Sequence, residues 1–95
     1  MGSIPVEATL YFSRMYFFAY VVRSKNRPYV YKGHCKDLEK RIREHNNGMT
    51  KSLRPFIPVE LVYHERFDSL KDAIKREKYF KTAAGRRFLK KILAK

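Results

Sequence analysis

The chain has 95 residues, with 22 Lys and Arg against 9 Asp and Glu and a formal net charge of +13 at pH 7. This length allows one domain with one hydrophobic core, and a hydrophobic content of 44% excludes a chain that is disordered throughout. So large an excess of positive charge indicates a polyanionic partner, with nucleic acid as the first candidate, although basic residues also commonly do no more than solvate a surface.

A membrane partner is not expected, because the longest apolar run, Met15 to Val22, is far shorter than the roughly 20 residues that cross a bilayer. Cys35 is the only cysteine, which excludes an internal disulfide and a cysteine-based zinc cluster. We therefore expect a cytoplasmic protein.

Residues 1–13 show no clear period and are expected to form a flexible N-terminal arm, followed by one domain over residues 14–95. Aromatic and β-branched residues predict strands at Tyr16–Val22 and Tyr29–Lys32, with a hairpin turn at Arg23–Pro28. Both alternating sets of side chains in the first strand are apolar, so we expect it to be covered on both faces.

The middle of the chain predicts a short helix and a third strand. Asp37 is a candidate N-cap for an amphipathic helix at Leu38–His45, which should end at Asn46-Asn47-Gly48. Met49–Ile57 reads as a basic loop, and Val59–Phe67 is predicted to form the third strand.

Two helices are predicted after the third strand. Ser69 and Asp72 resemble a capping box that opens the first of them, and Gly85 is expected to separate it from a last basic helix at Arg86–Ala94. The order β, β, α, β, α, α predicts an α+β fold, similar to an α/β sandwich, in which a small sheet is flanked by helices.

Four polar residues of the hairpin and the helix after it are candidates for chemistry. Tyr20 and Tyr31 come close if the hairpin register allows, and Arg41 and His45 lie one helical turn apart, so they can share one ligand. Together they could move protons and hold a phosphate. Taken singly, each also has an ordinary interpretation, as a core aromatic, an exposed arginine or a histidine at a helix end.

Glu77 lies on the apolar side of its predicted helix, where an unpaired carboxylate is costly. Lys81, four residues on, could pair with it, or the carboxylate could hold a divalent ion such as Mg²⁺. His34, Cys35 and His64 match no standard zinc spacing, so a zinc site is rejected.

Four motifs in order make the chain similar to the GIY-YIG endonuclease superfamily, in particular to its small stand-alone members related to the N-terminal nuclease domain of the bacterial excinuclease. The similarity covers about Tyr16 to Lys91. It rests on the segments Phe18-Ala19-Tyr20, Tyr31-Lys32-Gly33, Lys36 to Arg41 with His45-Asn46, and Arg76-Glu77-Lys78. The stretch from Lys81 to Leu89 also resembles these small members.

The resemblance implies a three-stranded antiparallel sheet flanked by helices and a metal-dependent endonuclease that uses Mg²⁺ or Mn²⁺ on DNA, with repair or recombination as candidate processes. It implies catalytic roles for Tyr20 or Tyr31 in activating or positioning the water, for Arg41 in stabilising the phosphate, for His45 in proton transfer and for Glu77 in holding the metal.

Gly33 would let the backbone pass close to the site, because it lacks a side chain. Basic residues would track the phosphate backbone; those we expect to bind nucleic acid are Lys32, Lys51, Arg54, Arg86 and Arg87.

The motifs depart from the family pattern in places, because Phe18-Ala19 replaces Gly-Ile and Lys32 replaces Ile. A non-catalytic nucleic-acid-binding module on the same scaffold is therefore the alternative, and nothing in the sequence excludes RNA as the partner.

Overall fold

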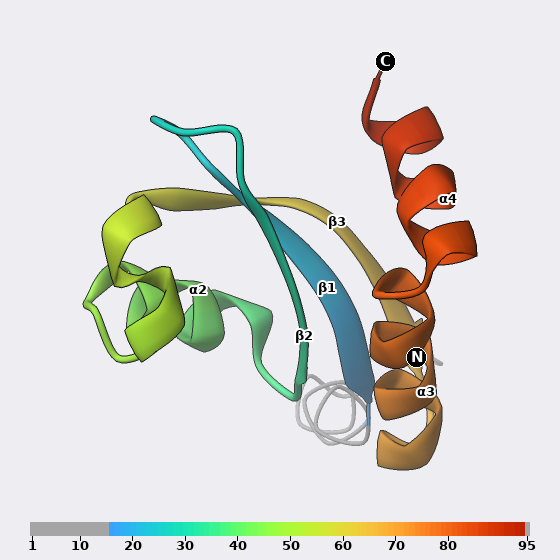
Figure 1. Cartoon of the computed structure of the whole chain (residues 1–95). Helices are drawn as coiled ribbons and strands as arrows, with labels where there is room; N and C mark the ends of the chain where they lie inside the picture. The colour runs from blue at the N-terminus through green and yellow to red at the C-terminus, as the bar shows by residue number, and fades with distance from the viewer. Residues whose placement is uncertain (1–15, 95) are drawn as a thin grey trace, which may run out of the picture.

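The protein is an α+β domain, described here by a computed structural model that covers residues 16–94; the arm predicted at 1–13 lies outside the described residues. The strands β1 (Phe17–Ser24), β2 (Val30–Cys35) and β3 (Val59–Phe67) form an antiparallel sheet in the order β2-β1-β3. The helices are α2 (Leu38–Asn46), the 3-10 helix η1 (Lys51–Phe56), α3 (Leu70–Phe80) and α4 (Ala83–Leu93). The predicted fold and order of elements are confirmed (Figure 1).

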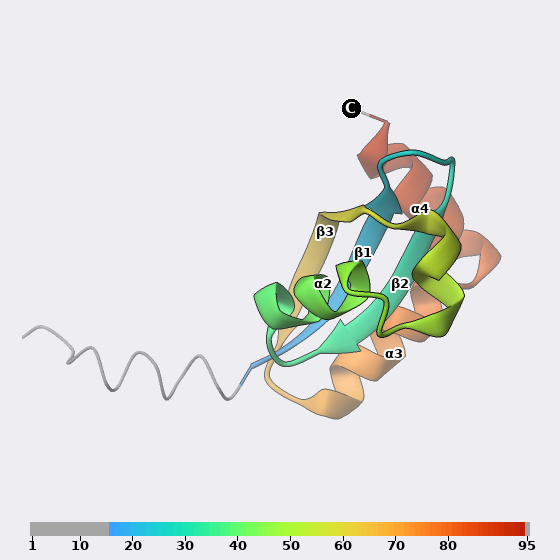
Figure 2. The same ribbon diagram turned by 90° about the vertical axis from the view of Figure 1, so that its left-hand side faces the viewer.

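The central strand β1 has helices on both sides, as its two apolar faces predict. Its residues 19–22 are all buried. Figures 1 and 2 show α2 and η1 on one face of the sheet and α3 and α4 on the other. We call these the α2 face and the α3 face. No helix within residues 16–94 has the length and apolar character needed to span a membrane.

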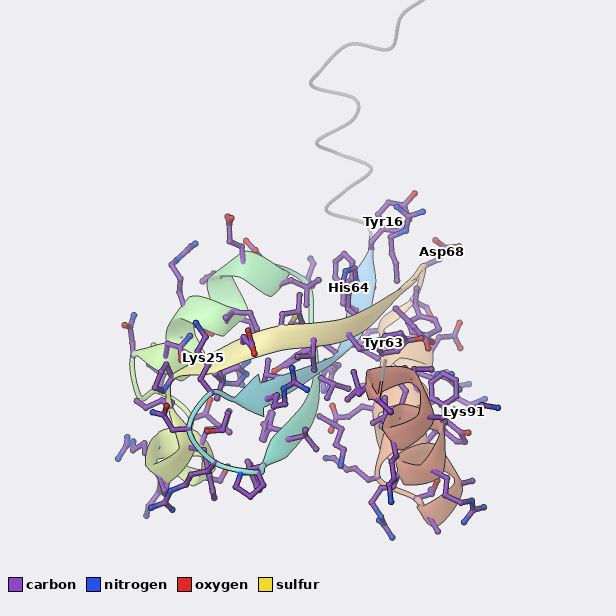
Figure 3. The ribbon with its side chains drawn as sticks, turned by 90° about the horizontal axis from the view of Figure 1, so that it is seen from above. Tyr16, Lys25, Tyr63, His64, Asp68 and Lys91 are labelled. Atoms are coloured by element: carbon purple, nitrogen blue, oxygen red, sulfur yellow. The ribbon has the colours of Figure 1, made fainter. Side chains whose placement is uncertain are left out.

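Alternation along β1 divides the buried side chains between two hydrophobic clusters. The cluster on the α3 face is built on Ala19, Val21, Phe80 and Leu89. The cluster on the α2 face is built on Tyr20, Val22, Leu53 and Val59. Strand β3 follows the same rule, because Tyr63 packs edge-on against Phe88 of α4, whereas the next residue, His64, points away from that helix (Figure 3).

Two helices begin at the caps that the sequence predicts. The Asp37 carboxylate accepts a hydrogen bond of 3.1 Å from the backbone N–H of Lys40. The Ser69 hydroxyl accepts one of 3.1 Å from the backbone N–H of Asp72. Each bond satisfies a donor that a helix leaves free at its first turn, so the local sequence fixes where α2 and α3 start.

Two expectations were wrong in detail. The segment 49–57 is not simply a loop, because η1 forms within it and inserts Leu53 into the core, fully buried. Gly85 does not separate the last two helices but lies in the first turn of α4, which begins after Thr82. A Cβ at Gly85 would lie 1.8 Å from the carbonyl oxygen of Tyr79, so the glycine serves a close approach of the two helices.

Candidate active site

The centre of the α2 face holds a hydrogen-bonded pair of buried side chains. Tyr20 projects from β1, and its hydroxyl shares a 2.7 Å hydrogen bond with Nε2 of His45 from the last turn of α2. Nδ1 of His45 lies 2.6 Å from the hydroxyl oxygen of Thr50. Tyr20 is 1% exposed and His45 is 0% exposed. Both imidazole nitrogens are therefore satisfied without water.

Burial also decides the charge of this pair. It lowers the pKa of His45 to about 4, an effect that the nearby Arg41 cation strengthens and Glu44 opposes. Burial raises the pKa of Tyr20 above its ordinary value of 10, although Arg41 draws it back in part. At neutral pH the pair is therefore uncharged.

Tyr31 and Arg41 border this pair on the side nearer to solvent. The ring of Tyr31 meets that of His45 edge-on, with centroids 5.3 Å apart, and Tyr31 is half-buried. Nη1 of Arg41 donates to Oε1 of Glu44 at 3.0 Å. Burial disfavours the charge on Arg41, but Tyr20 and Glu44 outweigh it and raise its pKa, so this guanidinium stays charged.

Arg41 opens onto a hollow of about 200 Å³ at the start of α2. The residues that line the hollow are Cys35, Lys36, Asp37, Lys40, Arg41 and Glu44. Three cations against two carboxylates, beside a partly exposed guanidinium, give this hollow the chemistry of an anion site.

Gly33 makes room for Tyr20. The two residues face each other across the β1–β2 ladder, and a Cβ on Gly33 would lie 2.5 Å from the Tyr20 oxygen and 2.6 Å from Cζ. Any larger residue would push the phenol out of its place beside His45. The neighbour that comes close to this glycine is thus a side chain of the same chain.

Glu77 belongs to a different cluster. It lies on α3, its side chain is 16% exposed, and each oxygen has a partner: His34 Nδ1 lies 2.6 Å from Oε1, and Lys81 Nζ lies 2.7 Å from Oε2. Burial would raise the pKa of Glu77, but hydrogen bonds from Lys81 and His34 lower it below the usual range. The ion pair with Lys81, one of the two interpretations of this acid, is therefore present.

The β-ladder separates Glu77 from the other four candidates. Gly33 pairs with Tyr20 and faces α2, whereas its neighbour His34 pairs with Ala19 and contacts α3. Tyr20, Tyr31, Arg41 and His45 gather on the α2 face, and Glu77 lies on the α3 face. Only the edge strand β2 lies between the two clusters, and in Figure 1 it runs between α2 and α3.

A family model described as the GIY-YIG catalytic domain matches residues 16–91. The chain belongs to the GIY-YIG family. A UPF0213 protein of Staphylococcus saprophyticus is 43% identical over 76 residues, which cover 79% of this chain and 92% of that protein. A UPF0213 protein of Clostridium perfringens is 38% identical over 79 residues, 82% of this chain and 84% of its own length. This membership supports a nuclease role on nucleic acid in general.

A solved structure gives a further likeness. The solution NMR structure of the UPF0213 protein BH0048 from Bacillus halodurans is 26% identical, with a TM-score of 0.49, and the match covers 82% of this chain and 85% of that one.

In this GIY-YIG domain Glu77 is the acid from which a metal site would have to be built. Residues 16–94 contain no group of three or more His, Cys, Asp or Glu that could hold a metal ion. Mg²⁺ and Mn²⁺ sites in nucleases need fewer protein ligands, because waters and substrate phosphates complete the coordination. An ionised, half-shielded carboxylate such as Glu77 fits that requirement.

The predicted nucleic-acid-binding residues fall into two groups. Lys32 and Arg86 line a hollow of about 190 Å³ between β2 and α4. Burial, and then the positive charges of Arg86 and Lys81, lower the pKa of Lys32. Arg87 is exposed on α4, whereas the two remaining residues, Lys51 and Arg54, are exposed on η1. The basic residues thus flank edge strand β2 on both faces.

His34 is the residue that reasoning from the sequence missed. It was considered only as a zinc ligand, and its real partner lies 43 positions away. Strand alternation was the available signal, because it puts His34 on the same face as Lys32 and opposite to that of Tyr31.

Proposed function

We propose that the protein is a metal-dependent endonuclease that hydrolyses phosphodiester bonds in cytoplasmic DNA, in repair or recombination, with its nuclease domain at residues 14–95 and residues 1–13 as an arm. One observation carries the proposal: the Tyr20–His45 pair, with Tyr31 and Arg41 beside it, and the Glu77 carboxylate flank the same edge strand. A DNA strand that crosses β2 would meet the guanidinium on one side and the carboxylate on the other.

The exposures of the two tyrosines divide their roles. Tyr31 is half-buried and can reach a water, whereas Tyr20 is 1% exposed. We therefore assign Tyr31 to activating or positioning the attacking water. A pKa of about 4 makes His45 a weak base at neutral pH, so we assign His45 and Tyr20 to holding Tyr31 in position rather than to proton transfer.

Arg41 is assigned to the scissile phosphate. Its charge is secure, it is partly exposed, and it opens onto the cationic hollow at the start of α2. A guanidinium can donate two parallel hydrogen bonds to phosphate oxygens and stabilise the charge that grows on them during attack. Gly33, directly after the Tyr31-Lys32 pair, leaves the backbone free to approach the strand.

Glu77 is assigned to the metal ion, Mg²⁺ or Mn²⁺. When bound, such an ion acts as a Lewis acid on the phosphate and lowers the pKa of a bound water. Lys81 competes for the same carboxylate, and its exposed side chain can turn away to release Oε2. Nearby cations oppose a free metal ion, so the phosphates of the substrate strengthen its binding.

The test is nicking of plasmid DNA in Mg²⁺ or Mn²⁺. Arg41→Ala and Glu77→Ala should each abolish nicking while leaving the circular dichroism spectrum of the folded domain intact. Arg43→Ala is the matched control, because Arg43 lies on the same helix, is exposed and pairs only with Glu39. If both site variants still cut DNA, the assignment is wrong.

A non-catalytic nucleic-acid-binding module is the second candidate. The observation in its favour is that both Glu77 oxygens are engaged by Lys81 and His34, on the opposite face from Tyr31 and Arg41. Binding of DNA or RNA that does not depend on metal, without cleavage of any strand form, would support this candidate.

A further inference from the structure

His34 and Glu77 bring a nitrogen and an oxygen ligand together at the edge of the sheet. His34 directly follows Gly33 on β2, Glu77 projects from α3, and Nδ1 of the first lies 2.6 Å from Oε1 of the second. The imidazole is partly exposed, whereas the carboxylate is 16% exposed. Two side chains from distant parts of the chain thus meet at a point that solvent reaches.

Their spacing is close to that of two neighbouring ligands on one metal ion. Adjacent ligands in an octahedral site with bonds of about 2.1 Å lie roughly 3 Å apart. A hydrogen atom now joins Nδ1 and Oε1, so an ion in its place needs a displacement of only a few tenths of an ångström. Lys81 holds the other oxygen, Oε2, and does not lie between the two donors.

We propose that His34 and Glu77 form a two-donor site that selects a transition-metal ion such as Mn²⁺ over Mg²⁺. The inference rests on the proposed function and names the metal class that its site takes. Imidazole nitrogen suits transition metals, whereas Mg²⁺ prefers oxygen ligands and retains its waters. With oxygen donors alone, Glu77 and water would distinguish the two ions only weakly; the nitrogen of His34 creates the preference.

Binding of the metal itself, measured on the full chain without DNA, tests the proposal. Free Mn²⁺ is followed by electron paramagnetic resonance, and Mg²⁺ binding is measured by calorimetry. His34→Gln should weaken Mn²⁺ binding about tenfold and change Mg²⁺ binding by no more than about twofold. His64→Gln, an exposed histidine on β3, is the matched control and should change neither.

A second measurement needs no variant. When Mn²⁺ is added in small amounts to the wild-type protein, the imidazole NMR signals of His34 should broaden first, before those of His64. Equal broadening of the two histidines overturns the proposal. So does a His34→Gln variant that binds both metals as the wild type does, or that loses affinity for both equally, as expected if the imidazole only orients the carboxylate.

The nicking assay keeps this inference separate from the proposed function. If Mn²⁺ binds through His34 and no DNA is cut, the endonuclease proposal fails and the metal site stands. If DNA is cut and the Mn²⁺ Kd of His34→Gln equals that of the wild type, the metal site fails and the endonuclease proposal stands.

Discussion

The hydroxyl of Tyr20 lies 2.7 Å from Nε2 of His45, in a part of the α2 face that water does not reach. This bond ties the central strand to the last turn of α2, 25 residues away in sequence. It therefore couples the stability of the fold to the order of the candidate site.

Tyr20→Phe is expected to lower the free energy of unfolding by about 1–3 kcal/mol, because it leaves Nε2 of His45 buried without a partner. Urea unfolding followed by circular dichroism measures the change. Tyr29→Phe is the matched control: that ring stacks on Phe56 at 3.8 Å between centroids, the phenylalanine keeps the stack, and the change should stay within about 0.5 kcal/mol. Equal effects of the two variants would contradict the importance of the Tyr20 bond.

The pKa of His45 predicts how stability depends on pH. The folded pKa is about 4, below the ordinary value of 6.5, so the unfolded chain binds more protons between these values. The contribution of His45 is fully present above about pH 6.5 and is lost as the pH falls toward 4, with a slope that approaches about 1.4 kcal/mol per pH unit. Unfolding in urea at several pH values measures this slope.

His45→Gln should flatten the slope in this window, because the variant has no group that titrates there. The NMR signals of the His45 ring should also stay unchanged from pH 8 to about 5.5 in the wild type. A titration near pH 6.5 would contradict the burial of this ring. The depressed pKa of Glu77 acts in a lower window, since its contribution is lost below its ordinary value of 4.5.

The sequence predicted the parts of this structure that depend on local chemistry. Asp37 and Ser69 cap their helices because the capping side chain and its N–H partner are three residues apart. The doubly apolar pattern of β1 correctly indicated a strand covered on both faces. Helical periodicity also indicated that Glu77 would be largely shielded, as its 16% exposure confirms.

The relation between the two faces could not be predicted in this way. Periodicity gives the buried side of α3, but not which face of the sheet the helix covers. The partner of Glu77 was missed for the same reason, because His34 reaches it through the β1–β2 register rather than through a spacing visible in the chain. Gly85 was taken as a helix break, since its contact with the Tyr79 carbonyl depends on tertiary packing.

Gly33→Ala should displace the phenol of Tyr20, because the new methyl group would lie 2.5 Å from its oxygen. We expect a loss of about 1–3 kcal/mol in the free energy of unfolding, from overpacking and a weakened bond to His45. A double-mutant cycle with Tyr20→Phe checks the cause. The double variant should lose less than the sum of the two single losses, whereas additive losses would show that the two sites do not interact.

Lys81→Gln should tighten the binding of Mn²⁺ and Mg²⁺ alike, because it removes a cation that holds Oε2 of Glu77 at 2.7 Å. The cost in stability should stay below about 1 kcal/mol, since the lysine is exposed and such surface pairs contribute little. Calorimetry measures both affinities. Lys75→Gln, an exposed lysine on the same helix, is the control; unchanged affinities in Lys81→Gln would mean that Glu77 does not hold the metal.

Lys32 and Arg86 should contribute to DNA binding through phosphate contacts from the hollow between β2 and α4. If each neutralises one phosphate, Lys32→Gln and Arg86→Gln should each reduce the slope of log affinity against log salt by about 0.9 on duplex DNA. Fluorescence anisotropy in EDTA measures the slope without cleavage. Lys25→Gln, in the exposed hairpin turn, provides the control; an equal change there would indicate that the DNA does not favour the α4 side of edge strand β2.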